Sequence, residues 1–173
     1  MENINDSNGN GFFTDSECGS IDVTLDYTIS LGVNVITEMA DLGEEVQYEL
    51  LMDNTEDVYG IEFIIADNPN NLTNISFEST ARIPADWNFT AEENANGQIE
   101  IMASGSTAIA AGDGSIFTGF SLVDDTALAS ITTIYYAVAM LMDMDGNSLY
   151  IAELGSDTFE IFPGFLPPAM NLV

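Results

Sequence analysis

The chain has 173 residues, 46% of them hydrophobic, which predicts one domain with a sizeable core and argues against disorder of the whole chain. It carries 29 acidic side chains and one basic side chain, Arg82, with no Lys and no His, for a net charge of −28. This balance argues against nucleic acid and anionic membranes as partners, and the missing His and Lys exclude catalytic triads, Schiff bases and the P-loop.

The acidic surface leaves two interpretations open. It either keeps the protein solvated and free of aggregation, or it attracts cations, Ca²⁺ or a basic partner. A glycosidase-like pair of carboxylates is compatible with the composition, but nothing in the sequence singles out two of them. We therefore expect a protein that is not an enzyme and needs no cofactor, with Ca²⁺ as the one ion left open.

Residues 1–20 are rich in Asn, Gly, Ser and acidic residues and are predicted to form an N-terminal arm. Phe12 and Phe13 are adjacent aromatic residues in this polar stretch, which suggests an anchor for another chain. The opening sequence lacks the basic and apolar regions of a secretory signal. No apolar run reaches the roughly 18 residues of a membrane span. We expect a location on a virion surface or outside the cell.

From Ile21 to Ile29 apolar and polar residues alternate, which predicts a half-buried strand. Further strands are predicted at residues 46–50, 58–66, 75–77, 98–101, 115–122, 131–142, 149–152 and 158–162, the longest of which, 131–142, is expected to be buried. Turn signals such as Asn96-Gly97 separate them, and no segment shows a convincing helical period. Residues 21–162 are therefore predicted to form an all-β, antiparallel two-sheet sandwich of about nine strands.

The large side chains of the irregular and apolar segments are expected to pack in the core or at an interface. Trp87 and Phe89 are expected to supply large groups of the core rather than a sugar-binding platform. The methionines are interpreted as core filler or interface padding; they are Met39, Met52, Met102, Met140, Met142 and Met144.

Residues 163–173 form an apolar, Pro-rich tail after Phe162, and its two consecutive prolines favour an extended path. An apolar tail on such an acidic protein should be covered, either by its own sandwich or by a neighbouring chain. Together with the two N-terminal phenylalanines, the residues predicted to contact another chain are Phe162, Phe165, Leu166, Met170 and Leu172.

One short motif resembles a metal site. Asp143, Asp145 and Asn147 match the first ligand positions of an EF-hand loop, but Ser148 replaces the glycine at the sixth position and Leu154 the glutamate at the twelfth. A hairpin turn with Gly146 at a positive φ explains these residues without a metal.

Several short motifs resemble the cohesin-type domain, the sandwich of cellulosome scaffolds and related surface modules. They lie within Val46–Ile161, a stretch of about two-thirds of the chain, and are Asp53–Phe63 (DNTEDVYGIEF), Leu72–Phe77, Gly97–Ala103, Gly112–Phe117 and Asp143–Asn147. The resemblance implies a two-sheet sandwich, and its turn-dominated motifs are more specific for fold than for function. Related acidic sandwiches occur in surface and virion proteins of marine bacteria and phages.

Two functions follow as hypotheses. The first is a structural surface protein of an assembled particle, most plausibly a phage virion protein that decorates the capsid and docks on other chains through its terminal arms. The second is a cohesin-like extracellular recognition module that binds a protein ligand or a carbohydrate through one sheet face, with or without Ca²⁺.

Overall fold

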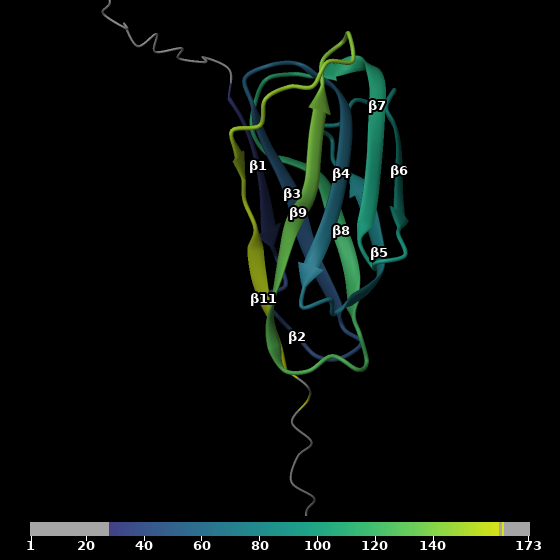
Figure 1. Ribbon diagram of the computed structural model, residues 1–173, viewed down its shortest axis with the longest axis vertical. Helices are drawn as coiled ribbons and strands as arrows, with labels where there is room; N and C mark the ends of the chain where they lie inside the picture. The colour runs from purple at the N-terminus through teal and green to yellow at the C-terminus, as the bar shows by residue number, and fades with distance from the viewer. Residues whose placement is uncertain (1–27, 163, 165–173) are drawn as a thin grey trace, which may run out of the picture.

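The computed structural model describes residues 28–162 and 164, which form two β-sheets packed face to face (Figure 1). One sheet contains five strands: β1 (Ile29–Val35), β3 (Glu45–Asn54), β5 (Leu72–Ser79), β8 (Ser115–Val123) and β10 (Glu153–Leu154). The other contains six: β2 (Met39–Ala40), β4 (Val58–Asn68), β6 (Asn88–Glu93), β7 (Ile99–Ile109), β9 (Ser130–Met142) and β11 (Asp157–Ile161). The strand orders are β10-β1-β3-β8-β5 and β2-β11-β9-β4-β7-β6. The predicted all-β sandwich is confirmed.

The pairing is antiparallel except at two short contacts. β10 runs parallel to β1, and β2 runs parallel to β11. The predicted strand at residues 149–152 is wrong, because this stretch forms no strand and lies between a bridge from Ser148 to Met142 and the two-residue β10. The predicted first strand starts at Ile29 in the structure, and residues 21–27 lie outside the described part.

The core lies between the two sheets and follows from period-two alternation. In β3 the inward residues Val46, Tyr48, Leu50 and Met52 are at most 1% exposed, while the residues between them face outward. Burying each such side chain stabilises the fold by about 1.5–3 kcal/mol. Large side chains from both sheets fill the centre, and the rings of Phe63 and Tyr136 meet edge to face at 5.1 Å. Trp87 is 8% exposed, as expected of a core residue.

Arg82 is half-buried against the edge where β3 meets the loop before β8. Its guanidinium donates hydrogen bonds to the carbonyl oxygens of Met52, Gly112 and Gly114 and to Oδ1 of Asn54. The only cationic side chain of the protein therefore satisfies internal acceptors, which leaves the acidic surface without a basic side chain.

Two of the predicted turns have the backbone that their glycines suggest. Gly97 connects β6 to β7 with a φ of 74°, and Gly146 lies in the turn after β9 with a φ of 80°. Among residues 28–162 and 164 there is no helix that could span a membrane.

Candidate binding face

The outward face of the six-stranded sheet brings apolar side chains of β4, β7 and β9 close together, with polar side chains between them. In one row Thr90 of β6 pairs with Met102 of β7, which pairs with Glu62 of β4, which in turn pairs with Met140 of β9. Met102 is 57% exposed and Met140 is 37% exposed. In the next row Ile64 pairs with Val138, which is 40% exposed. We call the outward residues of β4, β6 and β7, together with Val138, Met140 and Met142 of β9, the front face.

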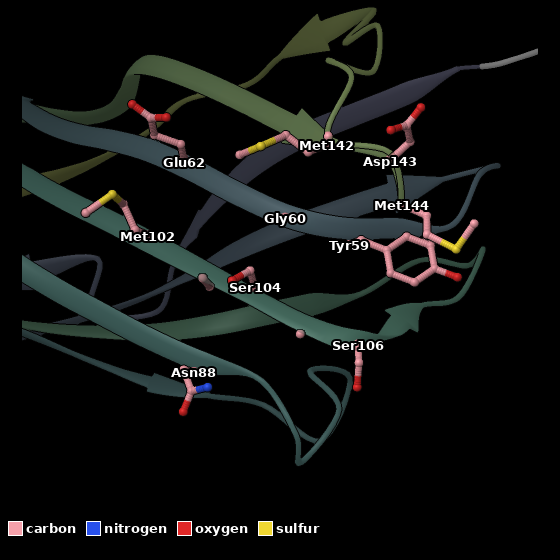
Figure 2. Close-up of a pocket in the computed structure, with 13 residues that line it drawn as sticks. Tyr59, Gly60, Glu62, Asn88, Met102, Ser104, Ser106, Met142, Asp143 and Met144 are labelled. Carbon is pink, nitrogen blue, oxygen red and sulfur yellow. The ribbon is translucent and has the colours of Figure 1, made fainter.

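An open pocket of about 590 Å³ lies at one end of the front face. Gly60 of β4 is its floor, and Figure 2 shows Met142, Asp143 and Met144 on one side of this strand and Ser104 and Ser106 on the other. A Cβ atom at position 60 would lie 3.2 Å from Cβ of Met142, which is tighter than an ordinary contact. Glycine therefore keeps the floor low, and the pocket is wide enough to hold one large side chain of a partner.

The pocket wall at Asp143 is a rigid turn. The Asp143 carboxylate accepts hydrogen bonds from the backbone N–H of Asp145 at 2.9 Å, from the backbone N–H of Asn147 at 2.8 Å and from the Asn147 side-chain amide at 2.9 Å. These bonds, led by the one from the Asn147 side chain, lower the pKa of Asp143 and keep it ionised. The chain makes a turn at this motif, as expected, with a bond from the backbone N–H of Gly146 to the carbonyl of Asp143 at 3.1 Å.

The charges on and around the front face are all negative. Glu62 stands exposed between Met102 and Met140, and Glu92 and Glu100 pair in the adjacent row. Since Arg82 is committed to internal carbonyl groups, nothing on this face offsets them. A partner that covers the face has to bring its own cations to these carboxylates.

The outward face of the five-stranded sheet is different in character. It presents the polar residues Asn34, Gln47, Glu49, Ser76 and Glu78, and among them the half-buried apolar residues Leu51, Phe120 and Leu122. The side-chain amide of Asn34 donates to Glu49 at 3.2 Å. The exposed large hydrophobic residues divide unevenly. Five lie in strands of the six-stranded sheet and one, Leu154, lies in the five-stranded sheet; the five are Met39, Met102, Ile131, Val138 and Met140. The most exposed apolar side chains of the strands are therefore concentrated on the six-stranded sheet.

The residues predicted to contact another chain fall mostly outside the described part. Phe12, Phe13, Phe165, Leu166, Met170 and Leu172 all lie there. Phe162 is described and is 48% exposed at the end of β11.

The expectation that residues 131–142 are buried was wrong for one side of β9, where Ile131, Val138 and Met140 face outward. Both sides of this strand are apolar, so the alternation that marks an outward face is hidden. The missed signal was the spacing of two between Met140, Met142 and Met144. Of the two roles considered for the methionines, core filler fits Met52, which is 0% exposed, and interface padding fits the exposed ones.

No protein-family model matches the sequence, and the search of curated proteins finds no significant relative. Solved structures do match. The cohesin module of a family 33 glycoside hydrolase from Clostridium perfringens is 15% identical with a TM-score of 0.64, covering 80% of this chain and 99% of that one. The sixth cohesin of scaffoldin B from Acetivibrio cellulolyticus, solved in complex with a Cel5 dockerin mutant, is 13% identical with a TM-score of 0.62, covering 79% and 99%.

A non-cellulosomal cohesin from the archaeon Archaeoglobus fulgidus is 22% identical with a TM-score of 0.56, covering 77% of this chain and 91% of that one. Each comparison covers nearly all of the cohesin module and about four-fifths of this chain. At these identities the likeness concerns the fold, and it confirms the resemblance suggested by the turn motifs. The protein has a cohesin-like β-sandwich fold.

Proposed function

We propose that the protein is a non-catalytic recognition module that binds another protein chain on its front face. The observation that carries this proposal is the group of exposed apolar side chains Met102, Val138 and Met140, which flank Glu62 and Ile64 in two neighbouring rows beside an open pocket. The apolar side chains on the outward face of the other sheet are half-buried, except for Leu154. Methionine side chains are flexible and polarisable, and they are common at surfaces that bind other proteins. A contiguous exposed apolar patch is a mark of an interaction site.

The similar structures support this proposal over a role on a virion. The Acetivibrio cellulolyticus cohesin was solved with a dockerin bound, and a cohesin of OlpA from Clostridium thermocellum was likewise solved in a cohesin–dockerin complex. The virion hypothesis depended on the terminal arms, and the comparisons add nothing in its favour. For this chain the partner is proposed at the level of chemistry: a protein surface with an apolar side chain for the pocket and basic residues for Glu62 and Glu100.

A protein partner also fits better than a carbohydrate. Sugar sites use exposed aromatic rings as stacking platforms, and the single Trp87 is buried with its Nε1 donating to the carbonyl of Thr107 at 2.6 Å. Tyr59 is half-buried at the rim of the pocket and is the aromatic residue nearest to it. The pocket is otherwise lined by methionine, glycine, alanine and polar residues, including the acidic Glu62 and Asp143.

The proposal is tested with a photo-cross-linking amino acid at Thr90, which lies on the front face, and in a separate protein at Ser76, on the outward face of the other sheet. Each protein is exposed to extract of the source cells, and the cross-linked partner is identified by mass spectrometry. We expect a specific partner from the Thr90 position and none from the Ser76 position.

Binding is then measured with the purified partner. Replacing Met102 and Met140 together by glutamine keeps side-chain length but adds polarity, and should weaken the affinity at least tenfold. Ser76→Gln is the matched control and should leave affinity unchanged. Cross-links from Ser76 alone, or full affinity in the double variant with an unchanged unfolding curve, would show that the front face is not the binding surface.

A further inference from the structure

A second exposed apolar surface lies at the end of the sandwich opposite the pocket. Four side chains form it, and we call them the base patch: Met39, Leu128, Ile131 and Phe162, which are 59, 80, 66 and 48% exposed. β9 is 13 residues long and has Ile131 near its start and Met142 at its end, so this patch and the pocket are separated by most of the height of the sheet, about 35 Å.

The strand register makes the base patch continuous. Met39 of β2 pairs with Glu160 of β11, and Glu160 pairs with Ile131 of β9, so one row crosses three strands. Phe162 follows two residues after Glu160 and therefore faces the same way, and its backbone N–H donates to the carbonyl of Ala40 at 3.0 Å. Within this row Glu160 is the only charged side chain.

A pocket of about 390 Å³ adjoins the base patch and shares Leu128 with it. Pro69, Ala127 and Ala129 supply the other apolar parts of its lining. The patch therefore borders a hollow with apolar side chains on one part of its lining, while Asn70, Asn71, Asp124, Thr126 and Ser130 supply hydrogen-bonding groups on the rest. An extended, apolar peptide with side chains of leucine or proline size fits such a surface.

We propose that the base patch binds residues 165–173 of the same molecule. The chain leaves the sandwich beside the patch, because Phe162 belongs to it and the backbone N–H of Gly164 donates to Oδ1 of Asp41 at 2.7 Å. Residues 165–173, FLPPAMNLV, contain no charged side chain, so the acidic surface does not repel them. In a polyproline-like path nine residues span about 28 Å, enough to cross the patch and reach the adjoining pocket.

Binding within one molecule is favoured over exchange between two copies. A tethered segment sees its site at an effective concentration in the millimolar range for a short linker. A second copy would bring another net charge of −28 close to the first, and association would cost about 4–15 kcal/mol in lost translational and rotational freedom. The C-terminal residues predicted from the sequence to contact a neighbouring chain are thereby assigned to their own sandwich. This inference is independent of the function proposed for the front face.

The test uses the full chain with methyl-labelled methionine. Cys18 is replaced by serine, Asn171 by cysteine, and a nitroxide is attached to the new thiol. We expect the Met39 methyl signal to be lost by paramagnetic broadening, while the Met144 signal, beyond the far end of β9, keeps its intensity. Met170, next to the label, is the positive control, and the unchanged signal of buried Met52 shows that the fold is intact.

Two further samples separate the alternatives. The double variant Leu128→Ser with Ile131→Ser should restore the Met39 signal, whereas Leu154→Ser, at a 51% exposed residue of β10, should not. A mixture of methyl-labelled protein without nitroxide and unlabelled protein with nitroxide should show no broadening. An unaffected Met39 signal in the first sample, broadening that survives the double variant, or broadening in the mixture would each overturn the proposal.

Discussion

Asp67 provides a stability prediction that can be worked out from the structure. It lies near the end of β4, is 9% exposed, and its Oδ2 accepts hydrogen bonds from the backbone N–H groups of Asn71 at 2.6 Å and Leu72 at 3.1 Å. Burial is the largest influence and raises the pKa of the carboxyl group from 3.8 to about 6, and the two backbone donors offset part of this rise.

The direction in which stability changes with pH follows from the proton uptake of the folded and unfolded states. Because the pKa of Asp67 is higher in the folded protein than in the unfolded chain, the folded state binds more protons between about pH 4 and pH 6. The stabilising contribution of this group is fully present below pH 4 and is lost as the pH rises through 6. The difference between 3.8 and about 6 corresponds to about 3 kcal/mol, which is an upper value for a group with partial access to water.

Asp67→Asn removes the charge and keeps an oxygen that can accept from the same two N–H groups. We expect the variant to exceed the wild type in free energy of unfolding by about 2 kcal/mol at pH 8 and to match it near pH 4. Urea unfolding followed by the fluorescence of the single buried Trp87, at several pH values from 4 to 8, measures the difference. The other carboxylates titrate in both proteins, so their effect cancels in the difference between the two free energies of unfolding.

Asp86→Asn is the control with the opposite sign. Exposed Asp86 accepts hydrogen bonds from the side chain of Ser106 and the backbone of Thr107, which lower its pKa to about 2. Its contribution is present above about pH 4 and is lost as the pH falls toward 2, so Asp86→Asn should be less stable than the wild type at neutral pH. A difference between Asp67→Asn and the wild type that stays constant from pH 4 to 8, or grows toward acid, would refute the reasoning.

Two further substitutions test the packing of the sandwich by the same urea assay. Arg82→Met removes the guanidinium donor from Oδ1 of buried Asn54, and it leaves the carbonyls of Met52 and Gly112 with only their backbone donors from Gly114 and Asn54. The expected cost is about 1–3 kcal/mol, mainly for the unsatisfied Asn54 oxygen. Arg82→Lys should recover only part of this cost, because one ammonium cannot reproduce the several bonds of the guanidinium; full stability of Arg82→Met would contradict the role assigned to the guanidinium. Gly119→Ala places a Cβ atom 2.5 Å from the Tyr48 ring and should lower the free energy of unfolding by about 1–3 kcal/mol, the usual cost of overpacking. Gly32→Ala is the control, because its Cβ atom meets only an ordinary contact of 3.7 Å with Leu51. Equal stability of the two alanine variants would count against the packing described.

The sandwich could be predicted because its signals are local. Alternation over Val46–Leu50 and the Asn96-Gly97 turn depend only on neighbouring residues, and both appear in the structure as expected. The predicted strand 98–101 was too short, because β7 continues to Ile109 through small and polar residues that face water on one side. β10 was missed because two residues carry no period at all.

The front face could not be predicted from the sequence, because which side of a strand is exposed depends on whether another part of the protein covers that side of the sheet. β9 reads as a buried strand when taken alone, and only the arrangement of the sheets shows that Val138 and Met140 have nothing on top of them. The role of Arg82 is similarly non-local: its acceptors come from residues about 30 positions away in either direction.

The last two strands, β10 and β11, follow each other in the chain but lie in different sheets, and this has a mechanical consequence. The described chain begins at Thr28, tied to Thr55 at one end of the sandwich, and leaves at the other end beside Asp41 (Figure 1). β10 lies parallel to β1, and β11 lies parallel to β2. A pull on the two ends therefore shears these parallel pairs along their length instead of peeling them apart one bond at a time. A module tethered at both ends would resist stretching through this geometry.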